Sequence, residues 1–215
     1  MIKIPRKQSD IKVKTYLEYE FFLNALTEEQ KNDELYLLKN TVMIFYNLTN
    51  EQYEELPYNV NLDLYKIIEN IFKMEKKLVP IFNLKGKQYG INPDFNDMTF
   101  AELVDCDTED IIRQIAILYR PIIKKRGKKY RIEKYKADIT NYELLKENLT
   151  LDIYYGFVGF FLRIQKDFIN YTLKSLRELD INPEQKKTLE ENGAGLVGFM
   201  NYVMVISPIR TLSLK

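Results

Sequence analysis

The chain has 215 residues, of which 46% are hydrophobic, 13% aromatic and 29% charged, and its 32 basic and 31 acidic side chains give a net charge of +1. This composition predicts a globular core, and the near-zero charge means that any attraction to nucleic acid or an anionic membrane must come from a local patch. There is no histidine and only one cysteine, Cys106, which excludes imidazole catalysis, histidine metal sites, Cys-based zinc sites and internal disulfides. We therefore expect a protein that is not an enzyme and uses no cofactor.

The N-terminal stretch MIKIPRKQSDIKVK has no apolar segment of the signal-peptide type. The most apolar charge-free run, residues 153–162, is far shorter than the roughly 20 residues that span a bilayer. We therefore expect a soluble protein without a membrane partner.

Helical periodicity dominates the first part of the chain, where capping-box patterns begin at Thr27 and Thr49. Five short helices joined by brief polar turns are predicted, and the short helix that opens at Thr49 ends at Pro57. The apolar residues that define three of their faces are Tyr16, Leu17, Phe21, Leu23 and Leu26, then Leu35, Leu38, Val42 and Phe45, then Leu64, Ile67, Ile68, Ile71 and Phe72.

The pattern changes at Leu78. Residues 78–84 and 87–91, separated by Lys85-Gly86, predict a β-hairpin. A helix from Ile111 to Tyr119 is expected next, capped by the acidic run that begins at Asp107 and closed by Pro121. The turn at Arg126-Gly127 then leads into a second alternating segment.

The chain is predicted to be helical again from Tyr142, with a long apolar helix over residues 151–179. A last helix begins near Pro183 and contains glycines between Gly193 and Gly198. The expected fold is mainly α, with helical bundles and a small β-hairpin element in the middle of the chain. The expected domains are residues 1–137, an N-terminal bundle with hairpins, and residues 138–215, a long-helix region.

The basic run from Lys124 to Lys136 contains eight Lys or Arg residues among thirteen, with Tyr130 and Tyr135 interleaved. Its motif G-K-K-Y-R-I, which starts at Gly127, repeats G-K-Q-Y-G-I, which starts at Gly86. Three interpretations stay open: a glycine turn with lysines that protect a sheet edge, a nucleic-acid surface with stacking tyrosines, and a protein-docking surface. The candidate phosphate or partner contacts are Lys124, Lys125, Arg126, Lys128, Lys129 and Arg131.

The segment around Gly156 is too apolar on all sides for a simple surface helix. It is interpreted as a buried central helix or as an interface with a partner or a second copy of the chain. The candidate interface residues are Tyr154, Tyr155, Phe157, Phe160 and Phe161.

Several other patterns do not support a catalytic or metal site. The acidic run 105–110 lacks the glycine and glutamate of an EF-hand loop, and helix capping explains it better. The E-x-K triplets at Glu29 and Glu184 fall at predicted helix starts instead of strands, and the glycines after Gly193 follow no strand.

The order of motifs resembles a group of tailed-bacteriophage proteins, often from phages of Bacteroidetes hosts, described as tail-assembly-chaperone-like or virion structural proteins. The matching segments are the run Met98 to Asp105 (MTFAELVD), the run Ile115 to Pro121 (IAILYRP) and the pair Phe160-Phe161, and the similarity extends over residues 14–180.

This resemblance implies a non-enzymatic role in building, filling or completing a phage particle, with no catalytic residues. Portal, tail or tape-measure proteins are the implied partners, and the virion or the host cytoplasm during assembly is the implied location. One version is a virion component of crAss-like phages, packaged with the genome as a cargo protein. The alternative from the residues themselves is a nucleic-acid-binding accessory protein that uses the basic run.

Overall fold

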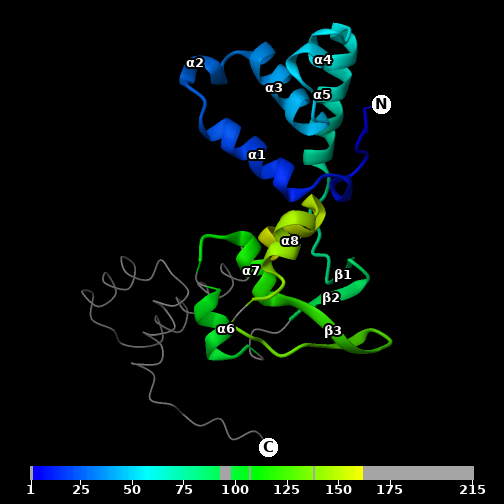
Figure 1. Cartoon of the computed structure of the whole chain (residues 1–215), viewed down its shortest axis with the longest axis vertical. Coiled ribbons are helices and arrows are strands. Elements are labelled where there is room, and N and C mark those ends of the chain that lie inside the picture. Colours follow the sequence, from blue (N-terminus) through cyan, green and yellow to red (C-terminus); the bar gives the residue numbers. More distant parts are fainter. Residues whose placement is uncertain (1, 93–97, 107, 138, 162–215) are drawn as a thin grey trace, which may run out of the picture. The chain divides into compact units, whose positions relative to one another are not determined.

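The computed structural model shown in Figure 1 describes residues 2–92, 98–106, 108–137 and 139–161. The chain forms two compact units, each built from two stretches: unit 1 is Met1–Gly86 with Thr140–Gly159, and unit 2 is Lys87–Ile139 with Phe160–Lys215. This division differs from the boundary expected at residue 137. The predicted helix beyond residue 161, the Pro183 helix and the glycines after Gly193 lie outside the described residues.

The helices of unit 1 are η1 (Gln8–Asp10), α1 (Val13–Asn24), α2 (Glu28–Lys31), α3 (Glu34–Tyr46), α4 (Asn50–Glu54), α5 (Tyr58–Lys73) and α8 (Tyr142–Asn148). Unit 2 contains α6 (Phe100–Asp105), α7 (Ile111–Leu118), β2 (Lys87–Ile91), β3 (Tyr119–Arg126) and β4 (Lys129–Ile132). With β1 (Ile81–Leu84), the strands have the sheet order β1-β2-β3-β4. The mainly α fold with a small β element is confirmed. No helix among the described residues has the length and apolarity that a bilayer crossing requires.

The core of the N-terminal helices follows the predicted spacing on α3 and α5, where Leu38, Val42, Leu64, Ile68 and Ile71 are buried. The predicted face was wrong at two positions, because Phe21 is 77% exposed and Leu35 is 63% exposed.

Phe21 was wrongly placed on the buried face because the apolar residues of α1 form two overlapping stripes, of which only one packs against other helices. Rings at three-residue steps, Tyr16, Tyr19 and Phe22, make the contacts with neighbouring rings, and Phe21 lies about 160° around the helix from Tyr19, the middle ring of that stripe. Leu35 lies in the first turn of α3, ahead of the buried stripe that starts at Leu38.

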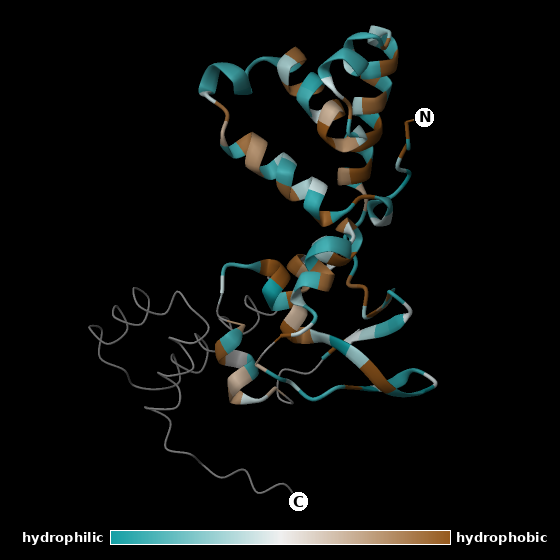
Figure 2. Ribbon diagram, in the orientation of Figure 1, coloured by the Kyte–Doolittle hydropathy of each residue, from teal (hydrophilic) through white to brown (hydrophobic). Residues whose placement is uncertain are grey.

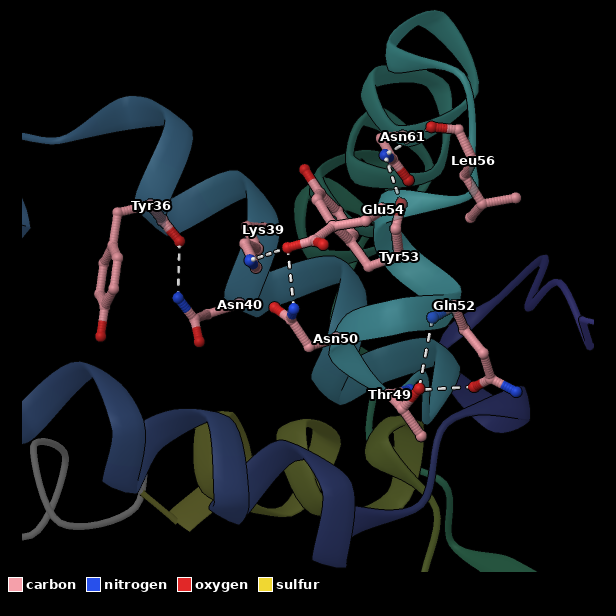
Figure 3. Close-up of polar contacts among 10 residues, drawn as sticks. All are labelled: Tyr36, Lys39, Asn40, Thr49, Asn50, Gln52, Tyr53, Glu54, Leu56 and Asn61. Atoms are coloured by element: carbon pink, nitrogen blue, oxygen red, sulfur yellow. Dashed lines mark hydrogen bonds and ion pairs between the residues drawn. The ribbon is translucent and has the colours of Figure 1, made fainter.

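Polar side-chain contacts join α3, α4 and α5, and a capping box begins α4, as Figure 3 shows. The capping boxes predicted at Thr27 and Thr49 are both present; at Thr49, its hydroxyl accepts from the Gln52 amide and the Gln52 side chain accepts from the Thr49 amide. Lys39 and Asn50 both reach Glu54 Oε1, at 3.3 and 2.8 Å. The buried Asn61 side chain donates to the carbonyls of Tyr53 and Leu56 and so ties the end of α4 to α5.

The later stretch of unit 1 returns to the start of the chain. The amide of Val13 donates to the Leu149 carbonyl and the amide of Leu151 donates to the Ile11 carbonyl, both at 2.9 Å. Residues 151–161 are helical, and Gly156 lies so close to the preceding segment that a β-carbon there would be 2.2 Å from the Lys77 carbonyl oxygen. Only glycine allows this approach without a shift of backbone.

The sheet of unit 2 is antiparallel, and β3 is its long strand. The first part of β3 pairs with β2, with Pro121 opposite Tyr89. The pairing with β4 starts at Ile122, which lies opposite Ile132, and continues from Lys124 after an irregularity between Ile122 and Lys124. Pro121 was expected to close α7, but the helix ends at Leu118 and the proline lies within β3. Proline disfavours a helical conformation in the residue before it, which moves the transition ahead of Pro121 itself.

The cap at the start of α7 comes from the acidic run, as the sequence predicts. Asp110 is the N-cap residue, and its carboxylate accepts from the Arg113 amide at 3.0 Å. Thr108 supports this turn by accepting from the Asp110 amide. Asp107, the first residue of that run, lies outside the described residues.

The two copies of the G-K-x-Y-x-I motif form turns of different register. Lys85 and Gly86 both have positive φ, 48° and 78°, as a type I′ hairpin turn requires. In the second copy Gly127 has φ 60° and is the first of the two turn residues between β3 and β4, as in a type II′ turn. The repeat therefore marks two glycine turns, offset by one residue.

Candidate functional site

The six basic candidates of the β3–β4 hairpin are all exposed: Lys124, Lys125, Arg126, Lys128, Lys129 and Arg131. Figure 2 shows a brown, apolar stretch of β3 that gives way to teal toward the hairpin tip. In the described part of the chain, the ion pairs involve none of these six side chains. The hairpin therefore presents uncompensated positive charge to solvent.

The two tyrosines of the basic run make contacts within unit 2. Tyr130 donates its hydroxyl to the Ile91 carbonyl at 2.7 Å, and its ring occupies the space where a β-carbon on Gly90 would be 2.4 Å from ring atom Cε2. Tyr135 donates its hydroxyl to the Asp105 carboxylate. Burial raises the pKa of both phenols. Base stacking, one reason to interpret the run as a nucleic-acid surface, is not the role that this geometry gives these rings.

A buried ion pair connects α6 to β3. Glu102 Oε1 lies 2.6 Å from Arg120 Nη2, and these side chains are only 2% and 11% exposed. The other oxygen of Glu102 accepts from the Thr99 amide at 2.6 Å, so the same carboxylate also completes the capping box of α6. The sequence reasoning missed this group, although Thr99 and Glu102 have the Thr-x-x-Glu/Gln spacing of a capping box, which marked the other caps with glutamine in the last position.

Further polar groups extend this buried cluster. The guanidinium carbon of Arg120 lies 6.0 Å from the centre of the Tyr135 ring. The Gln114 side chain donates to the carbonyls of Cys106 and Thr108 at 3.3 and 2.6 Å. Burial, with the nearby Glu102 and Asp105, raises the pKa of the Cys106 thiol to about 12, so the thiol stays protonated at neutral pH. These contacts fix α6, α7 and β3 to one another, which is a structural role.

The aromatic segment around Gly156 is mainly buried. Tyr154, Phe157 and Phe161 have little exposed surface, whereas Tyr155 and Phe160 are partly exposed. The geometry of the first three is that of core side chains. Of the five candidate interface residues, Tyr155 and Phe160 retain surface that a partner would reach.

Unit 1 carries a second aromatic feature that the sequence reasoning did not single out. Seven partly exposed rings contact one another with centroid separations between 5.1 and 6.3 Å, and we call them the aromatic cluster. Its members are Tyr16, Tyr19, Phe22, Tyr36, Phe45, Phe72 and Tyr155.

The aromatic cluster has polar groups at its edge. Tyr16 donates its hydroxyl to Glu20 at 2.6 Å, and the ammonium of Lys76 lies 4.2 Å from the centre of the Tyr155 ring. Burial raises the pKa of the Tyr16 phenol, and the hydrogen bond to Glu20 adds to that shift. An apolar centre with a polar and charged rim is typical of protein interfaces.

No group of three or more His, Cys, Asp or Glu side chains that would hold a metal ion is found within the described ranges. Comparison with family models, with curated proteins and with solved structures finds no match to this chain.

Proposed function

We propose that the protein is a non-enzymatic virion or assembly protein of a tailed bacteriophage that acts through contacts with portal or tail proteins. The order of the runs starting at Met98 and Ile115 and of the Phe160-Phe161 pair supports the phage origin. The aromatic cluster is the observation that supports protein–protein contact, because partly exposed Tyr and Phe rings are enriched at interfaces and dominate their energetics.

The aromatic segment around Gly156 and the aromatic cluster have different roles in this proposal. Tyr154 and Phe157 belong to the core, so the contact surface is assigned to the partly exposed rings of α1, α3 and α5, together with Tyr155. The partners are portal or tail components or a second copy of the chain, and packaging in the particle as a cargo protein is part of the same proposal.

Purified phage particles, treated with an amine-reactive crosslinker and analysed by mass spectrometry, test this proposal. The protein is expected in the particle, with crosslinks to portal or tail proteins from Lys76, an exposed lysine whose ammonium lies 4.2 Å from the centre of the Tyr155 ring. Absence from particles, together with no portal or tail protein co-purifying from infected cells, would contradict it.

Matched truncations locate the contact surface. Tyr36→Ala removes a ring that contacts only Phe22 among the aromatic cluster, so the fold should tolerate its loss. Tyr58→Ala removes a ring that is exposed at the start of α5 and lies outside the aromatic cluster. The first change should weaken co-purification of the partner about tenfold or more, as a truncated interface ring typically does, and the second should leave it unchanged.

A further inference from the structure

The register of the β3–β4 hairpin places cations directly opposite one another. Lys124 pairs with Arg131, and Arg126 pairs with Lys129. Paired residues of an antiparallel ladder point to the same side, and residues two apart on one strand share a side. Four cations therefore lie on one face of the hairpin, and we call it the cationic face: Lys124, Arg126, Lys129 and Arg131.

This arrangement disfavours the hairpin itself. Like charges directly opposite on neighbouring strands are destabilising, and no acidic side chain among the described residues forms an ion pair with the four cations. Lysines also protect sheet edges, but that role does not require the cations of the two strands to lie opposite one another. The uniform positive sign is therefore better explained by an anion that binds to this face.

The side chains around the cationic face indicate which kind of anion it binds. The side chain of Tyr130 is held against Gly90 and Ile91, and that of Tyr135 is held by Asp105, so no tyrosine of the run is set aside for base stacking. A stacking platform is the mark of single-strand binders, whereas contacts made by cations alone are typical of phosphate backbones. The major groove of B-DNA also admits a two-stranded β-ribbon.

We propose that the cationic face of the β3–β4 hairpin binds the phosphate backbone of duplex DNA without sequence preference. This inference does not rest on the proposed phage function, because it concerns a different surface and is tested with the isolated protein.

The test is fluorescence anisotropy of a short labelled DNA duplex with the full-length protein over a series of salt concentrations. Four phosphate contacts predict a slope of about −3.6 in a plot of log K against log salt concentration. Changing Lys124→Glu and Lys129→Glu together should lower the affinity at low salt by about 100-fold and reduce the slope to about −1.8 or less.

A matched double variant controls for net charge. Lys66→Glu with Lys87→Glu changes the charge by the same amount at exposed lysines of α5 and β2, and it should bind DNA within about twofold of the unmodified protein. Circular dichroism melts of both variants check that they fold.

The inference would be overturned by binding that is absent or independent of salt, by an equal loss in the two double variants, or by tighter binding of single-stranded than of duplex DNA. Polyglutamate that competes as well as duplex DNA at equal charge concentration would also overturn it, because an acidic protein surface would then be the better ligand.

Discussion

Unit 1 and unit 2 place their charged groups differently. Among the described residues, every ion pair of unit 1 joins side chains that are at least 34% exposed, whereas the ion pair of unit 2, between Arg120 and Glu102, is buried. Unit 1 instead keeps aromatic rings partly exposed, and unit 2 keeps the cationic face exposed.

In each unit, the contacts that stabilise the fold therefore involve different groups from those that stay exposed for a partner. Exposed ion pairs contribute about 0–1 kcal/mol, so the stability of unit 1 must come from its apolar and close backbone contacts. The buried pair of unit 2 is sensitive because the loss of either charge leaves the other without compensation. Four further predictions test this comparison, in decreasing order of expected effect.

The largest expected effect is at the buried ion pair. Glu102→Gln keeps an oxygen that can accept from the Thr99 amide but leaves the Arg120 charge uncompensated, so the free energy of unfolding should fall by about 3–5 kcal/mol. The exposed pair of Glu147 with Lys14 is the control, and Glu147→Gln should change the free energy of unfolding by less than about 1 kcal/mol. Urea denaturation followed by circular dichroism measures both, and equal effects would contradict the comparison.

Close packing in unit 1 should show a smaller effect. Gly156→Ala places a methyl group against the backbone at Lys77 and should destabilise the protein by about 1–3 kcal/mol. Gly159 lies three residues later in the same helical stretch with nothing within 4 Å of an added β-carbon. Gly159→Ala should therefore stabilise by up to about 1 kcal/mol. Thermal melts of the two variants should shift in opposite directions, and a shared direction would refute the packing argument.

The hydrogen bond of Tyr130 gives a third and smaller effect in unit 2. Tyr130→Phe removes the donor to the Ile91 carbonyl and should lower the free energy of unfolding by about 0.5–1.5 kcal/mol. The exposed Tyr58 of unit 1 serves as control, and Tyr58→Phe should change stability by less than about 0.5 kcal/mol. DNA binding should survive Tyr130→Phe, since the hydroxyl is assigned to the fold.

The smallest effect at neutral pH concerns the thiol of Cys106. Its folded-state pKa of about 12 lies above the unfolded value of about 9, so its contribution to stability is complete below about pH 9 and is lost as the pH rises toward 12. The stability difference between the unmodified protein and Cys106→Ala should narrow over that window. Labelling by a thiol reagent should be slow at pH 8 and become fast in urea, and fast labelling of the native protein would contradict the burial.

Much of the helical fold could be predicted because its signals are local. The capping boxes at Thr27 and Thr49 and the buried stripe of Leu64, Ile68 and Ile71 are visible in a few consecutive residues. Phe21 was misplaced because neighbouring apolar residues on α1 define overlapping stripes, and tertiary contacts choose between them.

The sheet and the candidate site depend on distant partners, which a local pattern does not contain. The two glycine turns predicted hairpins, but the pairing of Pro121 with Tyr89 joins segments far apart in the chain. The exposure of the six cations could be expected from their charge. The face that four of them share could not, because it follows from the register of β3 with β4. Glu102 was missed because its burial depends on Arg120, a residue of another element.

In our proposal, the like charges that unit 2 holds opposite one another on the β3–β4 hairpin bind duplex DNA. The most direct test measures both the free energy of unfolding and the DNA affinity of the double variant Lys124→Glu with Lys129→Glu. This variant gives opposite charges to the two residues of each cross-strand pair. We expect a free energy of unfolding that is higher by about 0.2–1 kcal/mol for each pair, together with the loss of duplex binding. A variant that is less stable than the unmodified protein, or that binds DNA as well, would contradict it.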